Sequence, residues 1–274
     1  MDNGSTEVKL EALAARKIFS YLDDAHGIRM DEVYVAKQLA STNDWLLSAI
    51  QRGKSYRVCT TELQTAGRGT KDRVWCASES SANIYLSFSY PLGDSLDRQV
   101  AGLTLVLGIA AVGALRSFGV KSPVFLKWPN DLYMSSGKLG GILVETVSFN
   151  GLRHAIIGVG INLVPPVNCH SRTASLRECM AWIELVERNR LVGYLLDQML
   201  AACGQYRDYG FAPWRDTWNS LDYTAMKTIR VSTVNGEIVG RGLGVDTEGR
   251  LLIGLNDHQI TSLVAGEVTL QDIV

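Results

Sequence analysis

Two short stretches of the chain carry positive side chains in settings that suit the binding of anions. Lys138 comes directly before an apolar, β-branched run at 142–147, so we expect it at the start of a buried strand. Arg68 stands between Gly67 and Gly69. Glycine lets backbone amides approach an anion closely, and arginine can grip phosphate or carboxylate with two parallel hydrogen bonds. A lysine on a strand and an arginine on a loop could therefore bind one phosphate together.

The residues before Lys138 add amide and carboxylate groups. An apolar run at 125–128 ends at Pro129, because proline has no amide proton for a strand ladder. Asn130 and Asp131 follow, and their short side chains suit a turn. We expect this turn to hold Asp131 near Lys138. Taken alone, however, the stretch is more typical of a solvated hairpin with an ordinary lysine.

A third polar group occurs earlier in the chain. Ser41, Thr42 and Asn43 open a predicted helix, where a hydroxyl caps free backbone amides. A helix start presents unpaired donors, so the same residues could cap the helix or contact a ligand. Gln64 follows a predicted strand at 56–63 and is either solvated or ligand-binding.

Composition limits the classes of function. The chain has 274 residues, a formal charge of −1, 46% hydrophobic and 20% charged residues, which is typical of one large globular domain with a small second one. A near-neutral balance does not favour nucleic-acid binding. Five widely spaced cysteines without a C-x-x-C motif predict reduced thiols rather than disulfides or a zinc site, and four histidines argue against a histidine metal centre.

No segment is predicted to direct the chain to a membrane or out of the cell. The N-terminus carries Asp2 and Glu7 and lacks an apolar signal core. The apolar run at 100–115 is shorter than the roughly 20 residues of a membrane span. Arg98 and Arg116 flank it, so we expect a buried core helix and a cytoplasmic protein.

Hydrophobic periodicity predicts an α/β chain with a β-rich end. Helices are expected over 6–22, 41–51, 99–118, 184–209 and 213–223, and strands over 32–39, 56–63, 83–90, 124–128, 142–147 and 153–163. An Asn-Gly pair at 150–151 predicts a hairpin turn. From Thr228 onward, turns at 235–236, 248–249 and 256–257 separate short strands, which indicates a small β-barrel.

The motifs together resemble those of biotin protein ligases. Lys-Trp-Pro-Asn-Asp at 127–131 and Lys-Leu-Gly-Gly-Ile-Leu-Val-Glu at 138–145 look like two central segments of that family. Ser-Thr-Asn at 41–43, the Gly-Arg-Gly loop, Gly-Val-Gly-Ile-Asn at 158–162, and the tail segments at 244–252 and 266–270 resemble further family motifs in the same order. The resemblance covers roughly residues 36–270.

The resemblance implies a fold and an activity. We expect an α/β, class II-synthetase-like catalytic domain over 1–222, with a mixed sheet flanked by helices, and an SH3-like barrel over 223–274. About forty residues precede the first motif, too few for a winged-helix DNA-binding domain, so a monofunctional ligase is implied. It would convert biotin and ATP into biotinyl-5′-AMP. Mg²⁺ would be bound with the nucleotide, and no metal site made by the protein alone is expected. The acyl group would then pass to a lysine of a carboxylase's biotin carboxyl carrier domain. We expect a monomer or weak homodimer without nucleic-acid or membrane partners.

The same resemblance assigns residues to the two substrates. Biotin would be bound by Ser41, Thr42, Asn43, Gln64, Gly67, Arg68, Trp75, Lys138 and Gly141, and ATP or the adenylate by Arg68, Gly69, Lys71, Arg73, Trp75, Asn130, Lys138 and Asn162. Joining a carboxylate to ATP builds charge at the α-phosphate, which calls for fixed cations such as Lys138 and Arg68. Asp131 is the candidate base for the acceptor amine. Trp75 and Trp128 could instead only fill the core.

One departure from the family loop keeps alternatives open. Thr70 replaces an arginine and Asp72 replaces a glycine. Losing that cation predicts weaker retention of the adenylate unless Lys71 or Arg73 compensates, and lysine is not equivalent to arginine at such sites. A non-catalytic biotin-binding homologue is therefore one alternative. Lipoate or octanoate ligation is another, although such ligases normally lack the Ser-Thr-Asn and Lys-Trp-Pro-Asn-Asp runs.

Overall fold

A seven-stranded mixed sheet forms the centre of the computed structural model, which describes residues 10–75, 82–92, 100–149, 151–166, 169, 172–181, 187–255 and 259–270. Its order is β1-β2-β3-β7-β6-β5-β4. Only β1 and β2 run parallel, and the other neighbours are antiparallel. The strands are β1 (Val33–Leu39), β2 (Val58–Gln64), β3 (Ile84–Pro91), β4 (Phe125–Lys127), β5 (Asp131–Met134), β6 (Gly137–Phe149) and β7 (Leu152–Ile161). The expected mixed sheet is confirmed.

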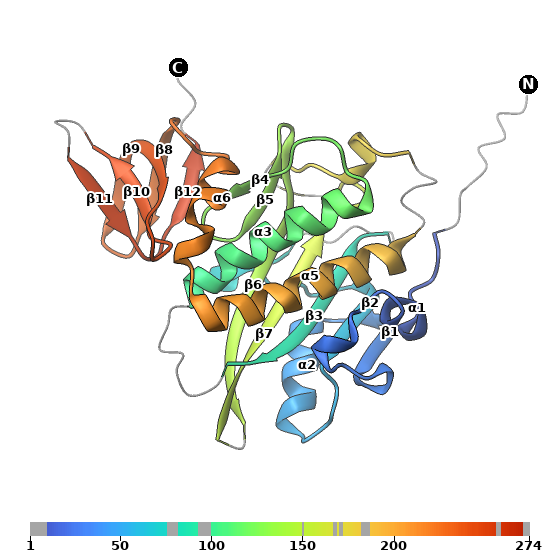
Figure 1. Ribbon diagram of the computed structural model, residues 1–274. Coiled ribbons are helices and arrows are strands. Elements are labelled where there is room, and N and C mark those ends of the chain that lie inside the picture. Colours follow the sequence, from blue (N-terminus) through green and yellow to red (C-terminus); the bar gives the residue numbers. More distant parts are fainter. Residues whose placement is uncertain are drawn as a thin grey trace, which may run out of the picture.

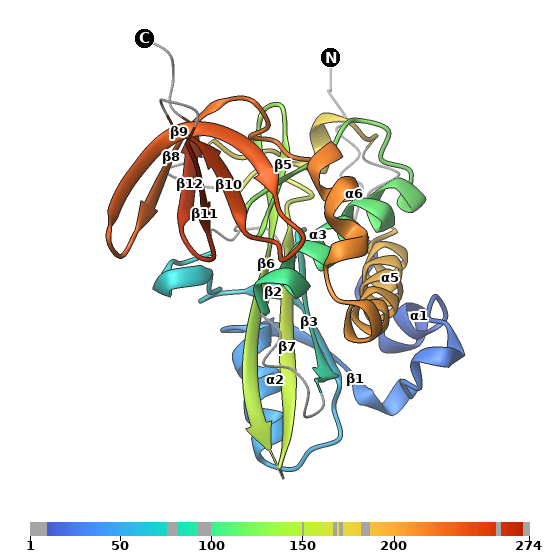
Figure 2. The same cartoon turned by 60° about the vertical axis from the view of Figure 1, so that its left-hand side comes forward.

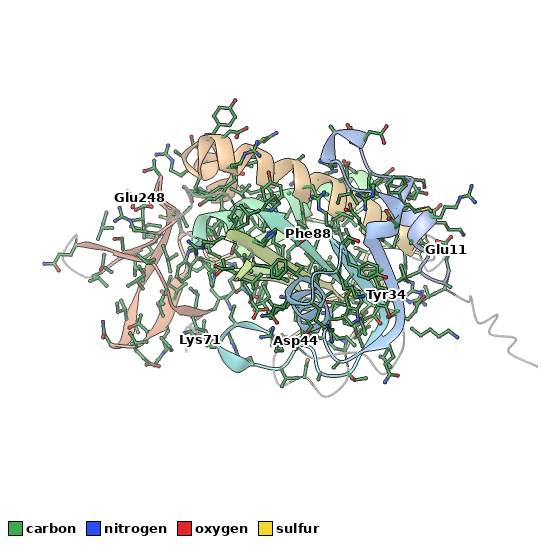
Figure 3. The ribbon with its side chains drawn as sticks, turned by 90° about the horizontal axis from the view of Figure 1, so that it is seen from below. Glu11, Tyr34, Asp44, Lys71, Phe88 and Glu248 are labelled. Carbon is green, nitrogen blue, oxygen red and sulfur yellow. The ribbon has the colours of Figure 1, made fainter. Side chains whose placement is uncertain are left out.

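Helices cover both faces of this sheet. The long helices α3 (Val100–Phe118) and α5 (Arg188–Tyr209) pack against each other on one face (Figure 1). Helix α2 (Thr42–Gln51) packs on β2 and β3 from the other face, as the view from below shows (Figure 3). Helix α3 is long and apolar enough to span a membrane by composition, yet most of its side chains are buried. The expectation of a core helix is confirmed.

A second, five-stranded antiparallel sheet follows the short helix α6 (Arg215–Ser220). Its order is β11-β10-β9-β8-β12, and it lies beside the β4–β5 edge of the main sheet (Figure 2). The strands are β8 (Thr228–Thr233), β9 (Gly236–Val245), β10 (Leu251–Gly254), β11 (Ile260–Leu263) and β12 (Glu267–Leu270). This separate sheet is consistent with the expected SH3-like domain.

Trp128 joins the two sheets. Its ring is 2% exposed within the main core, and its Nε1 donates to the carbonyl of Gly249 at 3.2 Å. Leu126 also bonds the connector before β8, because its amide donates to Leu221 and its carbonyl accepts from Tyr223, each at 2.8 Å. Trp128 therefore packs in the core and does not line a ligand pocket.

The N-terminal helix is shorter than predicted. Helix α1 covers Ala15–Phe19 only, and residues 10–14 are not helical. The amide of Leu13 donates to Glu62, that of Ala14 donates to Asn189, and Asn189 donates back to the carbonyl of Ala12. These tertiary partners take backbone groups that a helix would use, which propensity cannot anticipate.

Other differences concern cysteines and boundaries. Cys169 is disulfide-bonded, so the prediction of reduced thiols is wrong there, while Cys59, Cys179 and Cys203 form no disulfide. Sequence spacing could not reveal the bridge, because its formation depends on how close two cysteines come in the fold. Helix α5 starts at Arg188 rather than near 184, and residues 182–186 lie outside the described chain, as do Cys76, Asn150 of the predicted turn and the turn at 256–257.

Candidate active site

A cavity of about 190 Å³ opens where α2, β6, β7 and the loop after β2 meet. The strands form its wall and the N-terminus of α2 its end, so the residues come from elements far apart in sequence. Most residues predicted to bind substrate line it: Ser41, Thr42, Asn43, Gln64, Arg68, Gly69, Arg73, Trp75, Asn130, Lys138, Gly141 and Asn162.

A hydrogen-bonded polar cluster closes one end of the cavity. Gln64 Oε1 accepts from the amide and hydroxyl of Thr42 at 2.9 and 3.2 Å. Ser87, on β3, bonds Thr42 Oγ1 at 2.7 Å and Asn43 Oδ1 at 2.6 Å. Ser41 accepts from the Asp44 amide, so it caps α2 as predicted. A fixed end of this kind can present donors and acceptors to a small polar ring.

Lys138 is held at the start of β6 by backbone bonds to the segment at 172–174. Its amide donates to Arg172 at 3.1 Å, and its carbonyl accepts from Ala174 at 2.8 Å. Lys138 Nζ pairs with Asp131 Oδ1 at 2.6 Å and lies 5.4 Å from the centre of the Trp75 ring. The turn between β5 and β6 thus brings lysine and aspartate together, as the sequence predicted.

Arg68 reaches the cavity from the loop after β2. Its Nη2 lies 2.6 Å from Asp44 Oδ1 and 2.7 Å from Glu145 Oε2. Burial alone would lower the pKa of Arg68, but hydrogen bonds and charges from Glu145 and Asp44 outweigh it and raise that pKa. The guanidinium is therefore charged and bound to two carboxylates.

Trp75 closes the cavity against two glycines of the wall. A Cβ on Gly160 would lie 2.8 Å from the indole ring, and one on Gly141 would lie 3.3 Å from it. Any side chain at Gly160 would displace the tryptophan, which explains the glycine in this strand. The indole Nε1 is buried without a hydrogen-bond partner among the described residues.

Two asparagines fix the wall around Lys138. Asn162 Nδ2 donates to the carbonyls of Lys138 and Ala174 at 3.3 and 3.1 Å, and its Oδ1 is buried without a partner in the described part of the chain. Asn130 donates to the carbonyl of Ile142 at 3.0 Å. Asn162 thus connects the start of β6 to the segment at 172–174 beside the cavity.

Comparison with known proteins identifies the family. Residues 35–162 match the model of the biotin/lipoate A/B protein ligase family. The bifunctional ligase/repressor BirA of Escherichia coli is 34% identical over 269 residues, which is 96% of this chain and 79% of that protein. The biotin–[acetyl-CoA-carboxylase] ligase of Mycobacterium tuberculosis is 30% identical over 240 residues, covering 85% of this chain and 87% of that one. The chain belongs to the biotin protein ligase family.

Solved structures agree in fold. Biotin protein ligase from Aquifex aeolicus, in complex with biotin and ATP, superposes with a TM-score of 0.71 at 23% identity and covers 87% of this chain and 98% of that one. The Leishmania major enzyme with biotinyl-5-AMP gives a TM-score of 0.55 at 19% identity, covering 85% and 98%. The mixed sheet and the separate C-terminal sheet are thus those of a biotin protein ligase.

Three predicted site residues of this ligase do not line the cavity. Lys71 is exposed, with a left-handed φ of 56°, and lies on the loop near the lower edge of the view in Figure 3. Gly67 packs against Gln64, because a Cβ on Gly67 would come 2.4 Å from Gln64 Nε2. Asp131 lies beside the lining residues, since it pairs with Lys138 through its carboxylate and with Gly141 across the β5–β6 ladder.

Arg73 lines the cavity, but its charge is used elsewhere. Its Nη1 pairs with Glu267 on β12 of the second sheet, and its Nη2 donates to Thr70 at 3.3 Å. Neither Lys71 nor Arg73 therefore stands in for the cation missing at position 70 in this conformation.

Sequence reasoning missed Ser87, Asp44 and Glu145 as parts of the site. Ser87 is fully buried within an apolar strand, and this isolated polar residue was the available signal. Asp44 resembled an ordinary first-turn acid of a helix. Glu145 belonged to a recognised motif, but its contacts with Asn43 and Arg68 depend on tertiary structure.

Proposed function

We propose that the protein is an ATP-dependent biotin–protein ligase that forms biotinyl-5′-AMP and transfers biotin to a lysine of a carboxylase's carrier domain. The observation that carries the proposal is that Arg68 and Lys138 line one cavity whose far end is the polar cluster of Thr42, Gln64 and Ser87. The family membership of the chain supports the same reaction.

The polar cluster would bind the ureido ring of biotin. Thr42 and Ser41 would exchange hydrogen bonds with the ring. The side chains of Asn43 and Gln64 are held in position by their hydrogen bonds to Glu145 and Thr42. The apolar body of biotin would then lie along the glycines of β6 and β7 and beneath Trp75. This pose directs the valeryl carboxylate towards Lys138.

Adenylate formation would use the two cations. One carboxylate oxygen attacks the α-phosphorus of ATP, and pyrophosphate leaves. Lys138 stabilises the charge that develops on the α-phosphate, because a preorganised cation acts most strongly where charge is formed. Arg68 would bind the same phosphate from the loop, and Asn130 and Asn162 would contact the nucleotide. Gly69 lines the cavity beside Arg68, and its amide donates to the Arg73 carbonyl.

Magnesium would arrive with the nucleotide. The carboxylates near the cavity, Asp131, Asp44 and Glu145, all pair with Lys138 or Arg68. Mg²⁺ is usually held by substrate phosphates and water, with one or two carboxylates at most, so this donor set fits an ion bound mainly by ATP. Its chemistry would be to neutralise phosphate charge.

Transfer would follow once a carrier lysine reaches the adenylate. The amine attacks the acyl carbon, an amide bond forms, and AMP leaves. Asp131 would take the amine's proton, because its carboxylate lies beside Lys138 at the cavity. We further propose that the protein acts in the cytoplasm as a monomer or weak homodimer, with domains at 1–222 and 223–274.

Pyrophosphate release with purified protein tests the proposal. Release that requires both biotin and ATP is expected, followed by labelling of a carrier domain. Release that requires lipoate or octanoate instead would indicate the related acyl ligases. Biotin binding without any release would indicate a non-catalytic homologue, and either result would contradict the proposal.

A further inference from the structure

The guanidinium of Arg68 is engaged before any phosphate arrives. Both of its close carboxylate contacts, Asp44 Oδ1 and Glu145 Oε2, are made through the same nitrogen, Nη2. The loop that carries Arg68 is held by an isolated bridge to Val74 and a backbone bond from Gly69 to Arg73. Backbone hydrogen bonds therefore hold the loop, and two ion pairs place the guanidinium.

The two carboxylates differ in how firmly they are fixed. Glu145 lies on β6, its side chain is 29% exposed, and its Oε2 also accepts from Asn43 Nδ2 at 2.8 Å. Asp44 lies in the first turn of α2 and its side chain is 51% exposed. Among the described residues, the Asp44 carboxylate has Arg68 as its partner. Asp44 is the contact that can be released at lower cost.

Phosphate binding must compete with these contacts. The cluster contains three carboxylates, Asp44, Glu145 and Asp131, against the two cations Arg68 and Lys138. An added phosphate is repelled by the carboxylates and attracted by the cations. An exposed ion pair contributes about 0.2–1 kcal/mol, so phosphate oxygens can displace it.

We infer that Asp44 is a positioning residue that holds Arg68 at the start of α2 until ATP binds. The phosphates of ATP then displace Asp44 from Arg68, while Glu145 keeps its ion pair with Arg68. The inference rests on the proposed role of Arg68 in binding phosphate. Glu145 is fixed through Asn43 to the biotin end of the cavity, so Arg68 would turn about its contact with Glu145. Asp44 then sets how much ATP is needed to move the arginine.

The test measures the KM for MgATP in biotin-dependent pyrophosphate release at saturating biotin. Asp44→Asn keeps the shape and removes the charge. Its KM for ATP should fall roughly two- to fivefold, the range set by an exposed ion pair. Asp31→Asn is the matched control, because Asp31 pairs with Arg29 through an exposed contact outside the cavity. Its KM values should equal those of the unsubstituted protein.

Arg68→Ala and the double variant separate this mechanism from a general charge effect. Arg68→Ala should raise the KM for ATP, and Asp44→Asn should then have no further effect in its background. An unchanged or raised KM for ATP in Asp44→Asn, a change confined to kcat, or a fall that persists without Arg68 would overturn the inference. An unchanged KM for ATP in Arg68→Ala would instead refute the proposed role of Arg68 itself.

Discussion

The two cations of the cavity are presented by opposite kinds of structure. Lys138 stands on β6, where β5 pairs with it on one side and the segment at Arg172–Ala174 on the other. Arg68 stands on a loop that a bridge to Val74 and backbone hydrogen bonds hold, and two ion pairs place its guanidinium. Lys138 therefore stands within a sheet, whereas Arg68 stands on a loop.

This difference suggests a division of labour between the two residues. A charge on a rigid strand costs no reorganisation when the transition state forms, which suits Lys138 to stabilising the α-phosphate. A charge on a loop can first leave room for the substrate and then close over it, which suits Arg68 to retention of the adenylate. The substitutions below test each half of this comparison.

Removing the fixed cation should have the largest effect. Lys138→Ala is expected to lower the rate of biotin-dependent pyrophosphate release by about 10²- to 10³-fold, as for loss of one preorganised charge. The fold should survive, because the backbone of Lys138 makes its bonds without the side chain. Lys37→Ala, at an exposed position of β1, is the control. Near-normal turnover of Lys138→Ala would remove the lysine from the mechanism.

The two glycines beside Arg68 should respond differently. A Cβ on Gly67 would lie 2.4 Å from Gln64 Nε2, whereas one on Gly69 finds its nearest atom at 3.4 Å. Overpacking costs about 1–3 kcal/mol, so Gly67→Ala should raise the KM for biotin by about tenfold. Gly69→Ala should change it much less. Equal effects would mean that the loop rather than Gln64 is disturbed.

An arginine at position 70, on the loop that carries Arg68, should slow the release of the adenylate. Thr70 contacts Arg73, which pairs with Glu267 in the second sheet. In Thr70→Arg, a new charged hydrogen bond to phosphate should slow dissociation of biotinyl-5′-AMP by about tenfold. Thr70→Lys supplies the charge without the planar fork and should slow it less. A dissociation rate unchanged by either variant would show that position 70 does not limit retention.

The smallest effect is expected outside the cavity, at Asp222 in the connector to the second sheet. Burial raises its pKa despite hydrogen bonds from Thr224, and its Oδ2 has no partner in the described structure. The folded state therefore favours the protonated form. Its contribution to stability is full below the unfolded pKa of about 3.9 and is lost as pH rises through the higher folded pKa.

Asp222→Asn removes this titration and keeps an oxygen for Thr224. Chemical unfolding between pH 4 and 7 should therefore show a smaller decline in the free energy of unfolding with rising pH for the variant. Parallel curves for the two proteins would mean that Asp222 does not titrate differently on folding. The KM values for biotin and ATP should be the same for both.

The order of elements and the identity of the reacting groups were determined by the sequence. Alternating and helical patterns placed β1 to β4, β7 and α2 to within a few residues, because burial imposes those periods locally, whereas β6 begins at Gly137, before the predicted 142–147. Motif order predicted that Lys138, Arg68 and the Ser-Thr-Asn cap would belong to one site, and short turns predicted the contact of Lys138 with Asp131.

Tertiary structure alone decided which partners those groups have. Three sets of contacts join residues far apart in the chain: the ion pairs of Arg68 with Asp44 and Glu145, the hydrogen bond of Ser87 to Asn43, and the bond of the Leu13 amide to Glu62 before α1. A local pattern records whether a residue prefers water or the interior. It does not record which distant side chain the residue will contact, because that contact depends on how the whole sheet and its helices pack.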